Sequence, residues 1–253
     1  MTALSLQRTA GLARWNTVLL ARNRMALLYG VLLPLAPLLL LFAEGAGVGA
    51  AAIVTTLTMA VVFPVYYNVL SQFVNRRDEL VLKRLRAGET RDLELLVSLA
   101  LPGCVMALGV ALVAVPVAIA LGEPAPLNPL VYVGAAVLSV VLFAALAFWT
   151  AAWTRNAEAA QLTSLPVVLL ALLGQVSPGL PADVQRVVEW TPGAAMTELV
   201  RTGWFGFGEP GVERTLDAAG TWAAAGQPVL VLVGWTALAV WLAARSQHWE
   251  PRT

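Results

Sequence analysis

Charge is scarce in this sequence. Asp, Glu, Lys and Arg together make up 12% of the 253 residues, about half the share that is usual in soluble globular proteins. Hydrophobic residues make up 59%, and they gather into runs long enough to cross a bilayer, for which ~20 residues suffice. The composition excludes an ordinary soluble domain and predicts a membrane protein with about six spans.

Cysteine and histidine are almost absent, with one of each, Cys104 and His248. A single cysteine excludes an internal disulfide and a cysteine-rich metal site. Cys104 stands in an apolar run, which favours a small buried hydrophobe over a reactive thiol. The histidine lies in the C-terminal tail, so a buried Ser-His pair for intramembrane hydrolysis is missing. We therefore predict no catalytic residue, no metal site and no cofactor bound by this chain.

Residues that couple transport to an energy source are missing as well. None of the predicted spans carries an ionisable residue away from its ends, whereas proton-driven carriers and many channels need such residues inside the membrane. The phosphate-binding motif GxxxxGK[ST] occurs nowhere, so the chain has no P-loop for nucleotide. If this protein moves a substrate, a partner must supply the energy.

The apolar runs predict an all-α polytopic membrane protein with a single domain over residues 1–253. Pro34, Pro37 and Pro64 fall inside the first two spans and predict kinks. The fifth span is short unless the chain around Ser177 and Pro178 also enters the membrane. The predicted spans are residues 25–43, 50–74, 95–121, 130–153, 162–178 and 228–244.

Two further segments are amphipathic. Residues 5–24 predict a helix that lies in the membrane interface, with an ordinary solvated helix as the alternative, and they lack the apolar core of a signal peptide. Residues 179–227 predict two short interfacial or re-entrant helices. The second is expected to begin with Thr191 as N-cap and Pro192 in its first turn, with Glu198 and Arg201 on its polar side.

The distribution of basic residues predicts the orientation. An even number of spans puts both termini on one side, and thirteen of the 16 Lys and Arg residues fall on that side. Cytoplasmic segments are enriched in Lys and Arg, so both termini are expected in the cytoplasm and residues 179–227 outside. The Ala-, Val-, Leu- and Arg-rich usage is typical of a high-GC bacterium, which indicates a bacterial cytoplasmic membrane.

The only dense run of charge inside the chain is NRRDELVLKRLRAGETRDLE, residues 75–94. Each charge costs roughly 2.5–3.5 kcal/mol at the centre of a span, so this run must lie in water. Leu80, Leu82 and Leu85 give it a short apolar stripe. It therefore predicts an amphipathic helix, broken near Gly88, that presents a surface to a partner.

This charged run resembles the loop between the second and third spans of ABC-2 type transporter permeases, the membrane subunits of bacterial ABC exporters. Residues 76–79 match the start of the family pattern and Leu82–Arg86 match its basic, Leu-rich run, while Leu80 and Val81 replace the usual Gly-Thr. TPGAAMTELVR, residues 191–201, is similar to the Pro-containing segment before the last span of that family. An interfacial N-terminal helix, six spans and cytoplasmic termini are further family traits.

The resemblance implies a half-transporter. A second permease subunit, identical or similar, would complete the membrane pathway, and two copies of a separate ATP-binding subunit would hold ATP and Mg. The loop would dock that subunit as a coupling helix, although its charges could instead only anchor the inner interface. The implied docking residues are Arg76, Arg77, Asp78, Glu79, Leu82, Lys83, Arg84, Leu85 and Arg86, helped by Arg155 and Glu158 in the short polar loop 154–161.

In this family the second and fifth spans line the pathway. The resemblance therefore implies a set of pathway residues, for each of which simple helix packing is the alternative. Asn68 and Gln72 also share a helix face at i,i+4. The pathway set is Thr55, Met59, Tyr66, Asn68, Leu169 and Gln175.

Three classes of function compete. The first is ATP-driven export of an amphipathic or lipid-like compound, such as a drug or antibiotic, because an apolar pathway suits such cargo better than ions or sugars. The second is a non-transporting membrane sensor or assembly protein that uses the same loop to bind a partner. An intramembrane lipid enzyme is disfavoured by the missing catalytic residues. Membrane lipid is an expected contact in every case, and nucleic acid is not.

Overall fold

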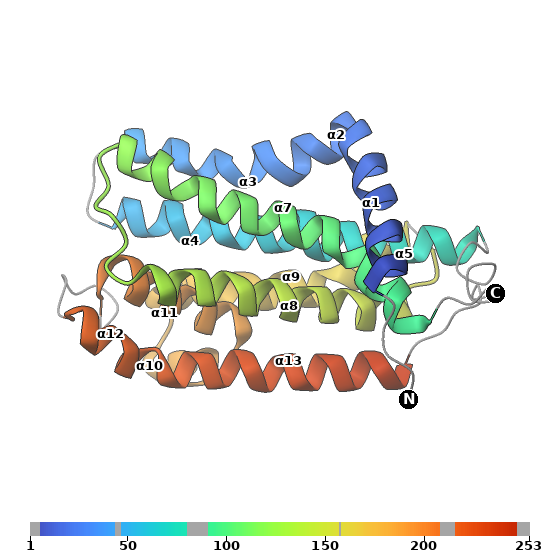
Figure 1. Ribbon diagram of the computed structural model, residues 1–253. Helices are drawn as coiled ribbons and strands as arrows, with labels where there is room; N and C mark the ends of the chain where they lie inside the picture. Colours follow the sequence, from blue (N-terminus) through green and yellow to red (C-terminus); the bar gives the residue numbers. More distant parts are fainter. Residues whose placement is uncertain (1–5, 44–46, 80–90, 157, 208–215, 247–253) are drawn as a thin grey trace.

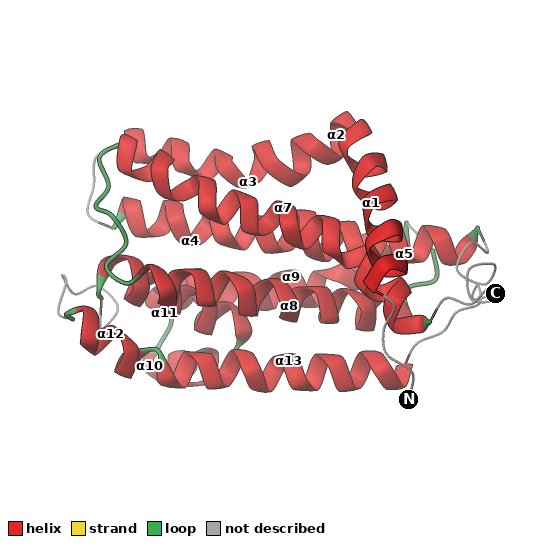
Figure 2. Cartoon of the chain, in the orientation of Figure 1, coloured by secondary structure: helices red, strands yellow, loops and turns green. Residues whose placement is uncertain are grey.

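The computed structural model describes residues 6–43, 47–79, 91–156, 158–207 and 216–246. Within these ranges the chain folds into helices and turns without a strand (Figures 1 and 2). Six helical segments in the described part are long and apolar enough to cross a membrane, which confirms the all-α class and fits a multi-pass membrane protein. They are Arg24–Phe42, Val48–Asp78, Asp92–Ala120, Pro129–Trp153, Ala159–Gly179 and Gly226–Ser246.

Three of the prolines coincide with departures from α geometry. The first span consists of α2 (Arg24–Leu27), the π-helix η1 (Leu28–Leu32), α3 (Leu33–Leu35) and the 3-10 helix η2 (Ala36–Phe42). The second consists of α4 (Val48–Ala60), the π-helix η3 (Val61–Tyr67) and α5 (Asn68–Asp78). Pro34, Pro37 and Pro64 lie in or beside the irregular turns, since a proline lacks the N–H that an α-helix needs at that position.

The other spans are more regular. They are α7 (Asp92–Ala120), α8 (Pro129–Trp153), α9 (Ala159–Val176) and α13 (Gly226–Ser246). A 3-10 turn, η4 (Ser177–Gly179), extends α9, so the fifth span has 21 residues rather than the short run predicted. The second span runs to Asp78, four residues beyond its predicted end.

Four shorter helices flank the bundle: α1 (Leu6–Arg22), α10 (Ala182–Val188), α11 (Pro192–Phe205) and α12 (Ala218–Ala224). The described ends of the chain, Leu6 in α1 and Ser246 in α13, lie at one end of the bundle, and α10 and α12 lie at the other (Figure 1). The predicted start of α11 is confirmed. Thr191 Oγ1 accepts a hydrogen bond from the Ala194 N–H, and Pro192 stands in the first turn.

The second span and α8 form the centre of the bundle. Their fully buried side chains include Leu57, Tyr66 and Phe73 from the second span and Phe143 from α8. In a lipid bilayer the hydrophobic effect contributes little to the association of helices, so close packing at small residues contributes more. Gly174 in α9 and Gly193 in α11 provide such a contact, because a Cβ on either glycine would collide with the backbone of the other helix.

The far end of α11 is fixed to the connection between α7 and α8. The Leu127 and Asn128 N–H groups donate to the Trp204 and Gly203 carbonyls, at 3.0 and 2.8 Å. Trp204 is buried, and its indole Nε1 donates to the Pro124 carbonyl at 2.9 Å. These bonds fix the C-terminal end of α11 to the α7–α8 connection, at the end of the bundle away from Leu6 and Ser246.

Candidate functional sites

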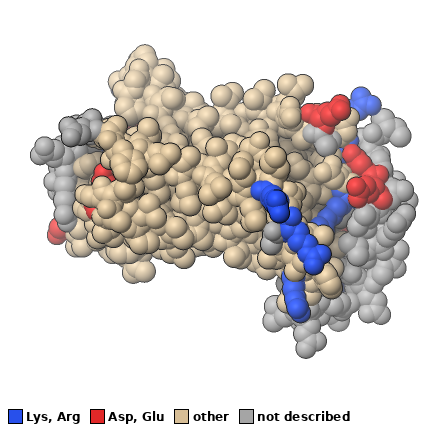
Figure 3. Space-filling model, turned by 90° about the horizontal axis from the view of Figure 1, so that it is seen from above, with Lys and Arg blue, Asp and Glu red and all other residues tan. Residues whose placement is uncertain are grey.

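Charged side chains gather at the ends of the molecule. Figure 3 shows arginine side chains toward one end only, and most of the rest of this face displays neither sign of charge. The basic end is the one where α1, α5 and the α8–α9 connection meet. It carries the described part of the predicted docking surface.

Arg77 is the centre of this end. Its side chain is 0% exposed, although it comes from the dense charged run. The guanidinium donates to three backbone carbonyls, those of Ala151 at 2.9 Å, Thr154 at 2.6 Å and Arg155 at 3.0 Å. Its Nε also lies 3.6 Å from the Asp78 carboxylate. The carbonyls at the end of α8 have no intrahelical partner, so a buried cation satisfies both the helix dipole and the orphan acceptors.

Arg77 thereby joins the two loops that were predicted to face the partner. It stands at the end of α5, just before residues 80–90, and it holds the backbone of the α8–α9 connection. A hydrogen bond of 2.8 Å between the Thr154 and Thr163 hydroxyls fixes the same connection to α9. The end of the second span, the α8–α9 connection and the start of α9 are therefore joined by direct hydrogen bonds.

Arg76 makes a second link, to the N-terminal helix. Its guanidinium donates to Asn16 Oδ1 at 2.8 Å, and Asn16 Nδ2 donates to the Ser98 carbonyl at 2.7 Å. Asn16 is 6% exposed, so this chain of bonds is largely shielded from solvent. It connects α1, α5 and α7 beside the contacts of Arg77.

The remaining predicted docking residues divide into two groups. Asp78, Glu79, Arg155 and Glu158 are exposed at the surface, and of these Asp78 also lies beside Arg77. Leu82, Lys83, Arg84, Leu85 and Arg86 lie outside the described residues. Of the described set, only Arg77 is wholly inside the protein.

A groove of about 770 Å³ lies beside the second span, between the first span, α7 and α9. Its wall is mainly apolar and includes Met59, Phe63 and Leu165. Six side chains with a polar group also line it, and they are Tyr29, Thr58, Tyr67, Asn68, Ser71 and Gln161. The Tyr67 hydroxyl accepts a hydrogen bond from Ser164 Oγ at 3.0 Å, which ties the second span to α9 along this groove.

The structure distributes the predicted pathway residues over three surroundings. Met59 and Asn68 line the groove. Thr55 donates to Gln175 Oε1, and Gln175 Nε2 donates to the Thr58 hydroxyl, both at 2.9 Å. This bridge joins α4 to α9 next to the groove.

Tyr66 and Leu169 lie elsewhere. Tyr66 is fully buried and donates from its hydroxyl to Thr150 Oγ1 of α8 at 3.0 Å. Leu169 is 60% exposed on the outer side of α9. Neither side chain is part of the groove wall.

Asn68 and Gln72 do share a helix face as predicted, since Gln72 Nε2 donates to Asn68 Oδ1 at 2.9 Å. Sequence reasoning missed Tyr29, Thr58 and Gln161 in the groove. A polar residue inside an apolar span is the signal that could have drawn attention to Thr58. Gln161 was counted as part of the polar loop, although α9 already begins at Ala159.

No protein-family model matches the chain, and no curated protein sequence matches it either.

Proposed function

We propose that this protein is the membrane subunit of an ATP-driven exporter of the ABC-2 type and moves an amphipathic or lipid-like compound outward. It would work as a pair with a second permease subunit in a bacterial cytoplasmic membrane. In this proposal both chain ends face the cytoplasm, α1 lies in the inner interface, and α10 to α12 dip into the outer one. A separate subunit would bind and hydrolyse ATP, and this chain would not.

The observation that carries the proposal is the buried Arg77. A partner that pushes on the surface of one loop must move the spans behind it, and flexible loops transmit such a push poorly. Because Arg77 joins the end of the second span to the α8–α9 connection, a displacement at either loop reaches the second, fourth and fifth spans together. Alternating access needs such a rigid-body response to a partner.

The groove supports the class of cargo. It borders the second and fifth spans, it is mainly apolar, and a few hydroxyl and amide groups interrupt its wall. Ligand sites for amphipathic molecules have this composition, with apolar walls and a small number of polar groups that orient the ligand. A proton or metal-ion pathway would need acidic or basic side chains, and the described residues of the groove wall include no Asp, Glu, His, Lys or Arg.

Co-purification tests the proposal. The chain is expressed together with its neighbouring genes, extracted in mild detergent, and assayed for bound partner and ATP hydrolysis. We expect a stable complex with ATPase activity. Reversing charge at Lys83, Arg84 and Arg86 together should release the partner or abolish its stimulation.

The matched control reverses charge at the other end of the bundle, at Asp183 and Arg186, whose side chains are 90% and 75% exposed. This variant should retain the partner and its activity. If the triple variant at residues 83–86 binds and stimulates the partner like the wild type, the docking assignment is wrong. If the chain elutes alone and without ATP turnover, a sensor or assembly role replaces the transport proposal.

A further inference from the structure

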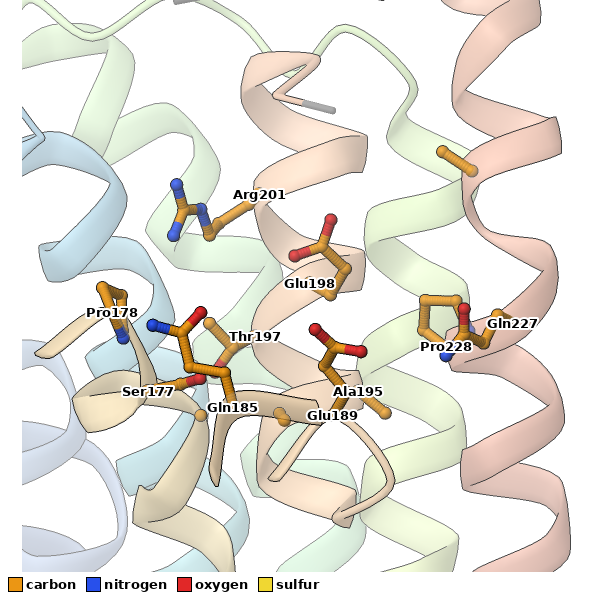
Figure 4. A pocket seen from close by; sticks show the side chains of 13 residues that line it. Ser177, Pro178, Gln185, Glu189, Ala195, Thr197, Glu198, Arg201, Gln227 and Pro228 are labelled. Atoms are coloured by element: carbon orange, nitrogen blue, oxygen red, sulfur yellow. The ribbon is translucent and has the colours of Figure 1, made fainter. Parts of the chain in front are cut away.

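A second cavity, of about 360 Å³, lies at the end of the bundle opposite Leu6 and Ser246. The end of α9 with η4, α10, α11, α12 and the start of α13 enclose it (Figure 4). Its floor and sides include Pro178, Ala195 and Pro228. Three charged residues line it, and they are Glu189, Glu198 and Arg201. Two acids against one base give the described lining a net negative charge.

Glu198 is the more buried of the two acids, since Glu189 is exposed. The Glu198 side chain is half-buried, and the only hydrogen bond that it accepts within the described structure is a long one, 3.4 Å from the Thr202 hydroxyl. Arg201, one turn away, does not pair with it closely. The Arg201 guanidinium instead lies over the Phe207 ring, 5.7 Å from the ring centroid, and points away from the Glu198 carboxylate in Figure 4.

The electrostatics of the cavity favour an added cation. Burial raises the pKa of Glu198, Arg201 and the Thr202 bond offset part of this rise, and the Glu189 carboxylate adds a smaller increase. Two carboxylates near one another repel, and a positive group between them would relieve both this repulsion and the cost of burial. The cavity is therefore better suited to a cation than to an anion.

Thr197 supplies an independent sign of a missing ligand. It is 7% exposed, it lines the cavity, and its hydroxyl has no hydrogen-bond partner. A buried helical threonine normally donates to the carbonyl four residues earlier, as Thr58 does to Val54 and Thr150 does to Leu146. Thr197 makes no such bond. The hydroxyl oxygen lies against Gly174 and is shielded from solvent, so a molecule in the cavity reaches it only after the Thr197 side chain rotates.

We propose that this cavity binds the primary ammonium group of an amphiphile. An ammonium ion has three N–H donors, and Glu198, Glu189 and Thr197 provide three acceptors around one space. Gln185 donates through Nε2 to the Leu180 carbonyl at 2.7 Å, which leaves its amide oxygen to accept as well. The hydrophobic part of the ligand would extend over the apolar side chains outside the cavity.

Such a surface lies beside the cavity. Val187 of α10, Trp190 in the following turn and Trp222 of α12 are 70%, 62% and 56% exposed. Tryptophan favours the boundary between lipid tails and headgroups. An amphiphile could rest its tail in the membrane there while its ammonium group enters the cavity.

A metal ion fits less well. Calcium takes six to eight oxygen ligands, and among the described residues no group of three His, Cys, Asp or Glu side chains comes together. A simple ion pair between Glu198 and Arg201 is the structural alternative. It would make both residues important for folding and neither important for binding an amine.

The inference does not depend on the proposed transport function, because binding can be measured on this chain without ATP or a partner. The protein is placed in nanodiscs of phosphatidylglycerol, which has no amine, and titrated with hexylammonium chloride in a calorimeter. Hexanol and hexanoate are the matched probes, because each has six carbon atoms and neither has a positive charge. We expect saturable binding of hexylammonium only.

Three variants test the residues. Glu198→Gln should weaken hexylammonium binding about tenfold or more, as expected for loss of a charge-assisted hydrogen bond. Thr197→Val should weaken it several-fold while leaving thermal stability equal or higher, because the variant removes a buried hydroxyl that has no partner. Asp183→Asn, an exposed acid on α10 outside the cavity lining, should bind like the wild type.

Affinity should also depend on pH with a defined sign. Ammonium binding needs the ionised form of Glu198, so affinity should rise as pH increases through the raised pKa of this group, with the amine still protonated. Within the described lining, Glu189 and Arg201 are the other charged groups that face Glu198. The part of the rise that belongs to Glu198 should be lost in Glu198→Gln, with only a dependence on Glu189 remaining, whereas a purely structural role for Glu198 predicts the same pH profile in both proteins.

A second arm identifies the source of the amine. Nanodiscs with equal parts of phosphatidylethanolamine and phosphatidylglycerol are examined by native mass spectrometry for retained lipid. Retention of phosphatidylethanolamine that Glu198→Gln removes supports a lipid headgroup, and hexylammonium binding without such retention supports a soluble amphiphile. Equal binding of hexylammonium and hexanol, or unchanged binding in both Glu198→Gln and Thr197→Val, overturns the proposal.

Discussion

Replacing Arg77 with methionine is the most informative perturbation of this fold. Methionine is similar in length but cannot donate, so the carbonyls of Ala151, Thr154 and Arg155 would lose their shared partner. A hydrogen bond from a charged donor contributes about 1.5–3 kcal/mol. Burying a guanidinium costs several kcal/mol, which offsets much of the gross gain from three such bonds. The net loss of stability should be about 2–4 kcal/mol.

The single cysteine offers a direct assay. Cys104 is half-buried in α7, so a thiol-reactive fluorogenic dye reports its exposure when the purified protein is heated in detergent. At about 2–4 °C per kcal/mol for a chain of this size, the unfolding midpoint of Arg77→Met should fall by roughly 5–15 °C. Arg77→Lys should lie between this variant and the wild type, because a lysine keeps the charge but lacks the planar fork.

Arg155→Met is the matched control, since Arg155 is a neighbouring arginine with an exposed side chain. Its midpoint should stay within about a degree or two of the wild type, as is usual for surface substitutions. If Arg77→Met unfolds at the same temperature as Arg155→Met, the buried arginine does not join the two connections, and the mechanical argument for coupling fails with it.

Three other substitutions probe the bundle with the same dye assay. Tyr66→Phe removes the bond to Thr150 without changing the packing, and should lower stability by about 0.5–1.5 kcal/mol; no change would show that the buried hydroxyl is equally well solvated in the unfolded state. Gln175→Leu breaks the bridge between α4 and α9 and should lower stability by about 1–2 kcal/mol, whereas a stabilised variant would mean that the bridge serves binding instead. Gly103→Ala places a Cβ against the backbone oxygen of Pro64 and should lower stability by about 1–3 kcal/mol or more. Gly103→Ser adds the same Cβ, so unchanged stability in that variant would contradict the expectation.

The spans could be predicted from sequence because the membrane imposes a strong local rule. Apolar runs of sufficient length mark every span, and the ends differ from those predicted by only a few residues. The largest difference, at the end of the second span, has a physical cause. A local rule expects charge to end a span, but Arg77 stays inside because carbonyls from α8 and its connection compensate for its burial. Those carbonyls belong to residues that lie 74 to 78 positions away from Arg77 in the sequence.

The sites were less accessible to sequence reasoning for the same reason. Thr55 and Gln175 stand 120 residues apart, and no periodicity within either span reveals that they meet. Residues 191–201 gave a correct helix start at Thr191, because capping is local. The same pattern placed Glu198 and Arg201 together on a polar face. In the folded chain the Arg201 guanidinium lies over the Phe207 ring and makes no close ion pair with the half-buried Glu198.

The arrangement of the bundle also bears on how two copies could be combined. The described ends, Leu6 and Ser246, lie on the same side of the six spans (Figure 1). A tandem fusion could therefore connect one copy to the next through a short aqueous linker, and both halves would insert with the same polarity. An odd number of crossings would have inverted the second half. A single-chain concatemer of this kind would let one half carry Arg77→Met or Glu198→Gln while the other stays intact, and so show whether one functional half is enough.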